Sequence, residues 1–228
     1  MQKALSSKEN IINIGHAGTA MRFLTSYFSC QVGRELILTG SERMQERPIK
    51  ILVDVLKCLG ADIKYQKNEG YPPLKIKGKK LEGSKIIIDG SVSSQYISSL
   101  LLVAGQFSNG LTLKFKGKVT SFPYIKMTLS LLSKVGIKNK YDPFKNTITV
   151  MPISQIATQK IPVESDWSSA SYYYSLVALS DKKTNITLSN YLENSLQGDR
   201  ALVKIYRDFF GVATRFSNNT MTLTNSKL

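Results

Sequence analysis

The sequence is poor in cysteine, histidine and tryptophan, and these scarcities exclude several classes of protein. Its 228 residues include two cysteines, one histidine and one tryptophan. Two cysteines cannot form the framework of a disulfide-rich domain, and Cys30 and Cys58 lack the paired spacing of a zinc site. Both lie in apolar helical patterns, so we expect reduced thiols buried in a core and no bound metal.

Long apolar runs are also missing. No segment approaches the length that crosses a membrane, and the N-terminus lacks the apolar core of a signal peptide. Apolar residues nevertheless make up 42% of the chain, which is enough for a folded core. We therefore expect a cytoplasmic globular protein without a membrane partner.

Acidic residues are outnumbered by basic ones, 16 against 31, which gives a net charge of +15. Such a charge raises the local concentration of anions, either nucleic acids or small phosphorylated molecules. The lysines mostly alternate along strand-like segments, as on a solvated sheet face, and no zinc finger, RRM signature or basic zipper is present. We expect no nucleic-acid partner. A basic nucleic-acid-binding repeat protein stays an alternative, which salt-dependent binding to random DNA would favour.

One pattern occurs three times at a spacing of 75 residues. Gly15, Gly90 and Ser165 each follow a short apolar run that predicts a strand, at 11–14, 85–88 and 160–163. Small polar residues and then a helical pattern follow each time. The predicted helices span 20–29, 96–104 and 170–179.

The second half of each repeat is also regular. Strands are predicted at 35–39, 111–115 and 185–188, and a second helix opens near Pro48, Pro123 and Gly198. These helices stop at Gly60, Gly136 and Gly211, and a hairpin-like pair of strands closes each copy. The fold class is therefore α/β (α+β), with three copies of a β-α-β-α-β-β unit.

The stretch at 89–95, Asp-Gly-Ser-Val-Ser-Ser-Gln, lies where a strand turns into a helix. At a helix start the backbone N–H groups lack partners and the dipole is positive, so the place suits phosphate or carboxylate. Serine hydroxyls add further donors. The alternative is that Ser93 or Ser94 only caps its own helix. The threefold recurrence of the pattern favours an anion site.

Several motifs carry a family resemblance. In chain order they are Gly-His-Ala-Gly-Thr-Ala-Met-Arg at 15–22, Leu-Thr-Gly at 38–40, Arg-Met-Gln-Glu-Arg-Pro-Ile at 43–49, Asp-Gly-Ser-Val-Ser-Ser-Gln at 89–95, Ser-Phe-Pro-Tyr at 121–124, Asp-Trp-Ser-Ser-Ala-Ser at 166–171 and Asn-Ser-Leu-Gln-Gly-Asp at 194–199. Together they resemble the 5-enolpyruvylshikimate-3-phosphate (EPSP) synthases, or 3-phosphoshikimate 1-carboxyvinyltransferases, over nearly the whole chain. Each motif is weak alone, whereas the ordered set is specific.

The resemblance implies an inside-out barrel fold of enolpyruvyl transferase type, with six repeat units in two domains. It implies transfer of the enolpyruvyl group of phosphoenolpyruvate to the 5-hydroxyl of shikimate 3-phosphate, with release of phosphate, in aromatic amino acid biosynthesis. The two substrates are the expected partners of a monomer that needs no cofactor. Residues 1–159 would be two units of the first, shikimate-3-phosphate-binding domain, and 160–228 one unit of the second.

The resemblance also implies roles for single residues. Shikimate 3-phosphate would contact Ser93, Ser94, Gln95, Ser121 and Tyr124. Phosphoenolpyruvate would contact Gly18, Arg47 and Gln95, and Thr19, Arg22 and Asp166 are further possible contacts. The arginine of the Arg-Pro motif lies beside a positive helix terminus, which is unfavourable unless an anion is present.

Some family features have no counterpart here. The family's N-terminal lysine-serine segment, its later aspartate and glutamate and its C-terminal arginines and lysine are missing, and no catalytic residue is assigned. We expect a middle fragment that binds shikimate 3-phosphate weakly at best and does not turn over. The alternative is a folded fragment without any activity. His16 replaces the family's usual asparagine, and we expect it to be structural.

Two related enzyme families are rivals. The enolpyruvyl transferase acting on UDP-N-acetylglucosamine carries a reactive cysteine in the loop before its Arg-Pro, and the loop at 40–47 has none. RNA 3′-phosphate cyclase should show a catalytic histidine late in the chain, whereas His16 is early. Both comparisons favour the EPSP synthases.

Overall fold

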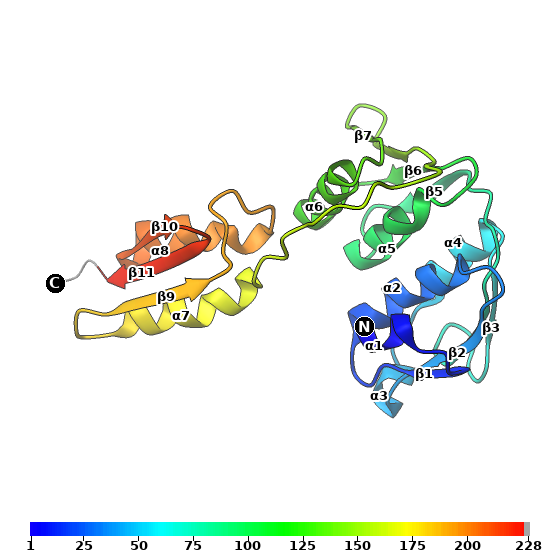
Figure 1. Cartoon of the computed structure of the whole chain (residues 1–228), viewed down its shortest axis with the longest axis horizontal. Helices are drawn as coiled ribbons and strands as arrows, with labels where there is room; N and C mark the ends of the chain where they lie inside the picture. Colours follow the sequence, from blue (N-terminus) through cyan, green and yellow to red (C-terminus); the bar gives the residue numbers. More distant parts are fainter. Residues whose placement is uncertain (226–228) are drawn as a thin grey trace. The chain divides into compact units, whose positions relative to one another are not determined.

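The computed structural model describes residues 1–225. They fold as two compact units, Met1–Ala157 and the described residues from Thr158 onward (Figure 1).

The first unit contains two repeats, and the first repeat follows a short helix, α1 (Gln2–Ser6). Its elements are β1 (Ile11–Asn13), α2 (Gly18–Ser29), β2 (Glu35–Thr39), α3 (Glu42–Gln45), α4 (Lys50–Cys58), β3 (Asp62–Tyr65) and β4 (Leu74–Lys77). The sheet has the order β1-β2-β4-β3. Strands β1 and β2 are parallel, and the other neighbours are antiparallel.

The second repeat has the same arrangement. Its elements are β5 (Lys85–Asp89), α5 (Ser94–Ala104), β6 (Leu111–Lys116), α6 (Phe122–Lys134), β7 (Asn139–Asp142) and β8 (Thr147–Val150). The sheet order is β5-β6-β8-β7, again with one parallel pair, β5 and β6. The predicted β-α-β-α-β-β unit is therefore confirmed in both repeats of the first unit.

The predicted helix ends are also confirmed. Gly60 and Gly136, which follow α4 and α6, have φ angles of +100° and +86°. These values lie in the left-handed region, which glycine adopts without a steric penalty. Each glycine therefore ends its helix and turns the chain back toward the sheet.

The two repeats share one apolar core, and helices α2 and α5 lie side by side in it (Figure 1). Buried hydroxyls mark the contact, with 3.1 Å between the Oγ atoms of Ser26 and Ser99. Ser98 accepts a hydrogen bond of 2.9 Å from Thr128 of α6. Small side chains with their hydrogen bonds satisfied let these helix backbones approach closely.

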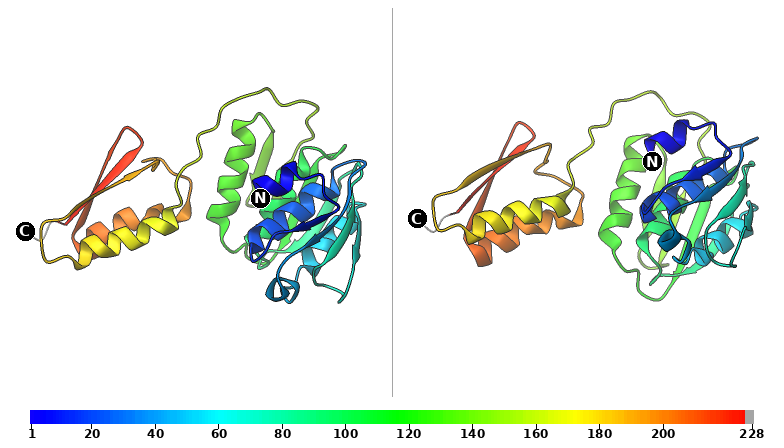
Figure 2. Two further views of the ribbon diagram at one scale, coloured as in Figure 1. Left: turned by 60° about the horizontal axis from the view of Figure 1, so that its bottom comes forward. Right: turned by 90° about the horizontal axis from the view of Figure 1, so that it is seen from below.

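The second unit contains α7 (Trp167–Leu179), β9 (Asn185–Ser189), the 3-10 turn η1 (Gly198–Ala201), α8 (Leu202–Phe210), β10 (Val212–Ser217) and β11 (Thr220–Asn225). Its sheet has the order β10-β11-β9. Helices α7 and α8 cover one face of this sheet (Figure 2). Its core is small and centres on the fully buried Trp167 and Tyr174.

The strand predicted at 160–163 is wrong. Residues 155–166 form neither helix nor strand, and among the described residues β9 pairs only with β11. In the first two repeats the leading strand pairs in parallel with the strand that follows the first helix. Pro162 has no N–H to offer such a ladder, which disfavours a strand of four residues.

One cysteine also departs from expectation. Cys30 is half-buried, but Cys58 is exposed. The apolar face of α4 is formed by Leu52, Val53 and Leu56. Cys58 follows Leu56 by two residues, which is about 200° around the helix, so its side chain lies on the opposite face.

Candidate anion-binding site at converging helix N-termini

The start of α5 is ordered by its own side chains. The Asp89 carboxylate accepts hydrogen bonds from the hydroxyl and the N–H of Ser91, at 2.6 and 2.7 Å. These two bonds, the hydroxyl bond first, lower the pKa of Asp89. The Ser93 hydroxyl is the N-cap and accepts from the Gln95 N–H at 3.3 Å. The Ser93 hydroxyl therefore does cap its own helix, as the alternative interpretation holds. A hydroxyl that accepts a hydrogen bond can still donate its own proton to a ligand.

This corner is open to solvent. Ser93 is exposed, and Ser94 and Gln95 are half-buried. All three side chains lie at the first turn of a helix of eleven residues. Backbone N–H groups and hydroxyls are thus accessible together at a positive helix end.

At the start of α2, two arginines meet over a glycine. A Cβ placed on Gly18 would lie 2.4 Å from Nη1 of Arg47 and 2.6 Å from Nη1 of Arg22. No side chain fits there while both guanidiniums keep these positions. The absence of a side chain at Gly18 is what admits two cations to the first turn of α2.

The two guanidiniums have no counter-charge in the part of the chain that the structure describes. Within residues 1–225 neither Arg22 nor Arg47 forms an ion pair. Arg22 is only 8% exposed, and its buried Nε makes no hydrogen bond to any described residue. A buried cation such as Arg22 is normally paired, whereas Arg47 is exposed, and both lie where the helix dipole adds further positive potential. An anion with several oxygen acceptors would satisfy this arrangement.

Hydrogen bonds connect the corners of the two repeats. The Gln95 side-chain amide donates to Thr19 Oγ1 at 3.1 Å, so the first turns of α2 and α5 touch. The Tyr96 hydroxyl donates to the Pro48 carbonyl at 2.8 Å, just before α4. The bond between Ser98 and Thr128 joins α6 to α5. In each repeat the two long helices follow two parallel strands, so both begin at the edge of the sheet where these strands end. The N-termini of α2, α4, α5 and α6 therefore lie at the same end of the first unit.

Ser121 and Tyr124 occupy the first turn of α6. Ser121 has a φ of +52°, an uncommon left-handed conformation for a residue other than glycine. Its side chain forms no capping hydrogen bond to α6. The Tyr124 side chain is 41% exposed. The predicted shikimate-3-phosphate contacts thus lie on two helices that pack together.

His16 has a structural bond, as expected. Its Nδ1 lies 2.8 Å from the Ser41 hydroxyl, which also caps α3. The Ser41 N–H donates to the Gly15 carbonyl at 3.1 Å. These contacts join the loop before α2 to the segment that carries Arg47. Sequence reasoning missed Ser41 and Tyr96, whose partners are distant in the chain.

Asp166 belongs to the second unit. Its carboxylate caps α7 by accepting from the Ser168 N–H at 2.9 Å. Its carbonyl accepts from the Tyr191 hydroxyl at 3.0 Å. The side chain of Gln197 bonds the Trp167 N–H and the Ser165 carbonyl, at 3.0 and 2.9 Å. These contacts make Asp166 part of a well-connected helix start.

No cluster of three or more metal-ligating side chains occurs among residues 1–225. No helix of that range is long and apolar enough to cross a membrane.

Fold and site together define, in the first unit, a pair of repeats whose helices gather their N-termini at one end, beside two arginines that form no ion pair within residues 1–225. The family model of EPSP synthase (3-phosphoshikimate 1-carboxyvinyltransferase) matches residues 1–226. The chain belongs to this family. Its similarity to known members agrees with the resemblance carried by the motifs.

Two curated relatives illustrate the similarity. A 3-phosphoshikimate 1-carboxyvinyltransferase of Bacteroides fragilis is 45% identical over 223 residues, which are 98% of this chain and 53% of the relative. One of Haemophilus influenzae is 42% identical over 195 residues, 84% of this chain and 44% of the relative. The chain therefore spans about half the length of the curated relatives it matches.

A solved structure shows the same fold. The EPSP synthase of Acinetobacter baumannii superimposes with a TM-score of 0.71 at 20% identity, over 96% of this chain and 47% of that chain. The fold class of the enolpyruvyl transferases is thereby established for the chain, with mixed sheets and covering helices.

Proposed function

We propose that this chain provides the substrate-binding corner for enolpyruvyl transfer from phosphoenolpyruvate to the 5-hydroxyl of shikimate 3-phosphate, which releases phosphate. The reaction runs by addition and then elimination, so atoms are conserved between the two substrates and the two products. Both substrates are polyanions. The observation that carries the proposal is the meeting of Arg22 and Arg47 over Gly18 without a carboxylate partner among the residues that the structure describes.

The residues divide into two groups in this proposal. Ser93, Ser94, Gln95, Ser121 and Tyr124 bind shikimate 3-phosphate through hydroxyl, amide and helix N-terminal donors. Gly18, Arg47 and Gln95 bind phosphoenolpyruvate, with Thr19 and Arg22 beside them. The bond between Gln95 and Thr19, at 3.1 Å, supports placing both groups at one site. Asp166 stays a possible further contact.

The chain's own residues bind and orient anions. An arginine fork matches a carboxylate or phosphate in two parallel hydrogen bonds, so the pair over Gly18 can fix the orientation of phosphoenolpyruvate. Enolpyruvyl transfer also needs a general acid and a general base. We assign neither role to a described residue. We therefore propose that the chain alone binds shikimate 3-phosphate weakly and does not release phosphate.

The remaining parts of the proposal concern the whole chain. Residues 1–159 would form part of the first domain of the transferase and residues 160–228 part of the second. The protein would be a cytoplasmic monomer that acts without a cofactor, a membrane or a nucleic acid.

Calorimetric titration of the chain with shikimate 3-phosphate, at low and at physiological salt, tests the proposal. We expect saturable binding. In a second titration, with phosphoenolpyruvate, we expect Arg47→Ala to weaken binding by roughly tenfold, the loss of about one charge-assisted hydrogen bond. Arg43→Ala is the matched control, because it removes the same charge from an exposed position four residues away. It should leave the affinity unchanged.

Three outcomes would contradict the proposal. The first is no binding at millimolar ligand. The second is equal loss in Arg43→Ala and Arg47→Ala, which would indicate general attraction by net charge. The third is salt-dependent binding to random DNA that shikimate 3-phosphate does not reduce. Release of phosphate by the chain alone would overturn the statement that it does not turn over.

A further inference from the structure

Tyr96 contacts Arg22 directly and also contacts the turn that carries Arg47. The guanidinium carbon of Arg22 lies 5.7 Å from the centre of the Tyr96 ring. The Tyr96 hydroxyl donates to the carbonyl of Pro48 at 2.8 Å, and Pro48 directly follows Arg47. The side chain is 7% exposed, so it lies behind the site rather than in it.

The aromatic ring holds Arg22 in a particular way. A carboxylate would neutralise the guanidinium and occupy its donors, whereas a ring face attracts the cation without accepting its N–H groups in a fork. Among the described residues Arg22 has no carboxylate partner. The ring therefore orients the cation while its charge and its donors stay available to a ligand.

The hydroxyl holds the other arginine through the backbone. Proline has no N–H, so the turn at Arg47 and Pro48 can donate only one backbone bond, which runs from the Arg47 N–H to the Met44 carbonyl at 3.2 Å. The bond from Tyr96 fixes the carbonyl at the other side of this turn. Without it, the segment that presents Arg47 loses a buried anchor.

Packing alone does not require a tyrosine at this position. The corresponding residue of the first repeat, 75 positions earlier, is Met21, which is 1% exposed. A flexible apolar side chain thus fills the equivalent place. The ring face and the hydroxyl of Tyr96 make contacts that methionine cannot make.

We propose that Tyr96 is the positioning residue of the anion site. Its ring aligns Arg22 and its hydroxyl fixes the turn that carries Arg47, so that both guanidiniums meet over Gly18. The inference rests on the proposed function, because it assigns a support to the same site. Tyr96 itself does not touch the ligand.

The test compares Tyr96→Phe, which keeps the ring, with Tyr96→Leu, which removes ring and hydroxyl. The matched control is Tyr65→Phe, because the buried Tyr65 hydroxyl makes no hydrogen bond to any described residue. Two readouts are recorded for each variant. One is the affinity for phosphoenolpyruvate, and the other is the set of arginine Nε–H signals in an NMR spectrum of the free chain.

The two variants have different expected signatures. Tyr96→Phe should shift the Arg47 signal, leave the ring-shifted Arg22 signal in place and weaken phosphoenolpyruvate binding by roughly three- to tenfold, as for one buried hydrogen bond. Tyr96→Leu should shift both signals and weaken binding further. Tyr65→Phe should change neither. A purely structural role would lower the melting temperature without this separation of the two arginine signals.

The outcomes separate the inference from the proposed function. If the wild-type chain does not bind phosphoenolpyruvate, the proposed function fails, and the arginine signals of the free variants still decide the role of Tyr96. If the wild type binds and folded Tyr96→Phe has the same affinity and the same Arg47 signal, the inference is overturned. Should Tyr96→Leu fail to fold, Tyr96→Phe alone decides.

Discussion

At the scale of single residues, the atoms around Gly18 and Gly40 determine whether a substitution there affects binding or stability. A Cβ on Gly18 would meet the ends of two arginine side chains, whereas a Cβ on Gly40 would lie 2.6 Å from the Gly15 carbonyl oxygen. Side-chain ends can move aside at low cost, but a backbone carbonyl cannot. Substitution at Gly18 therefore acts on the site, and substitution at Gly40 acts on the fold.

We predict that Gly18→Ala lowers the affinity for phosphoenolpyruvate on the order of tenfold, because the new methyl group displaces Arg47 and Arg22. The melting temperature should change little. Calorimetric titration and thermal unfolding measure the two effects separately.

Gly40→Ala is the contrasting variant, with an expected loss of about 1–3 kcal/mol in stability from overpacking. If Gly18→Ala destabilised the chain as much as Gly40→Ala and left the affinity unchanged, the arginine pair would have no part in binding.

The two cysteines differ in chemistry. Burial raises the pKa of the Cys30 thiol to about 12, and its Sγ lies 3.4 Å from the Ser26 carbonyl. Cys58 is exposed. We predict that at pH 8 a disulfide reagent modifies Cys58 in the folded chain and Cys30 only after unfolding, since the thiolate is the reactive form. Peptide mapping of the labelled chain identifies the site, and fast labelling of Cys30 would contradict the prediction.

Sequence reasoning identified most residues of the candidate site but not their supports. Gly18, Arg47 and Gln95 lie in motifs, and the structure brings them to one end of the first unit. Tyr96 was not recognised, because its role depends on contacts with Arg22 and Pro48 that are 74 and 48 residues away. Such contacts follow from the packing of one repeat on another, which local patterns do not encode.

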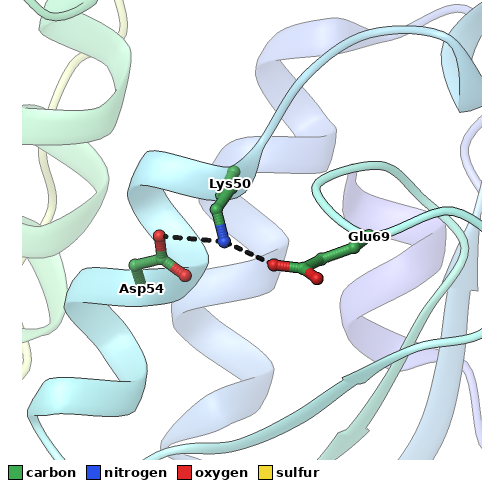
Figure 3. Close-up of polar contacts among 3 residues, drawn as sticks. All are labelled: Lys50, Asp54 and Glu69. Atoms are coloured by element: carbon green, nitrogen blue, oxygen red, sulfur yellow. Dashed lines mark hydrogen bonds and ion pairs between the residues drawn. The ribbon is translucent and has the colours of Figure 1, made fainter.

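At the scale of elements, α4 is tied to the loop between β3 and β4 (Figure 3). Lys50 Nζ lies 2.6 Å from Glu69 Oε1 and 3.5 Å from Asp54 Oδ2. The Ile49 N–H also donates to the Gly70 carbonyl at 2.8 Å. Because α4 follows the turn that carries Arg47, this loop supports the segment next to the site.

The ion pair has a pH signature. The hydrogen bond from Lys50 lowers the pKa of Glu69, so its contribution to stability is present above the unfolded pKa and is lost as pH falls through the folded pKa. We predict that Glu69→Gln has a melting temperature that declines less than that of the wild type between about pH 5 and pH 3. Glu82→Gln, an exposed carboxylate without an ion pair in residues 1–225, should decline like the wild type. Identical curves for Glu69→Gln and wild type would refute the assignment.

The second unit depends on a small core. Trp167 is fully buried, whereas Leu176 on the same helix is 59% exposed. We predict that Trp167→Ala costs about 3–5 kcal/mol and unfolds this unit, while Leu176→Lys leaves its melting temperature nearly unchanged. Thermal unfolding followed by circular dichroism checks the pair, and equal effects would contradict the description of the core.

Helices and strands could be predicted from the sequence where the same pattern occurs in more than one repeat. The strand-helix order, the glycine helix ends and the hairpins of the first unit follow from apolar periodicity and turn residues. The wrong strand prediction at 160–163 has a physical reason, because a short strand forms only when a neighbouring strand pairs with its backbone by hydrogen bonds. An apolar run containing Pro162 cannot by itself specify that neighbour.

At the scale of the whole molecule, residues 154–163 connect the two units and are all exposed. We predict that trypsin cuts first after Lys160, and that the fragment ending there stays folded and keeps its affinity for shikimate 3-phosphate. Mass spectrometry identifies the cut, and Lys160→Gln should delay it. A first cut within an element of the first unit, or loss of binding with the second unit, would contradict this division.

The central claim is that helices from two repeats direct their N-termini at one bound phosphorylated acid. The most direct measurement is titration of the isotopically labelled chain with shikimate 3-phosphate while the backbone amides are observed by NMR. We predict saturable shifts at Ser93, Ser94 and Gln95, accompanied by Thr19 across the interface between the repeats. Unmoved amides at these positions with millimolar ligand present, or shifts spread evenly over exposed lysine-rich strands, would contradict the claim.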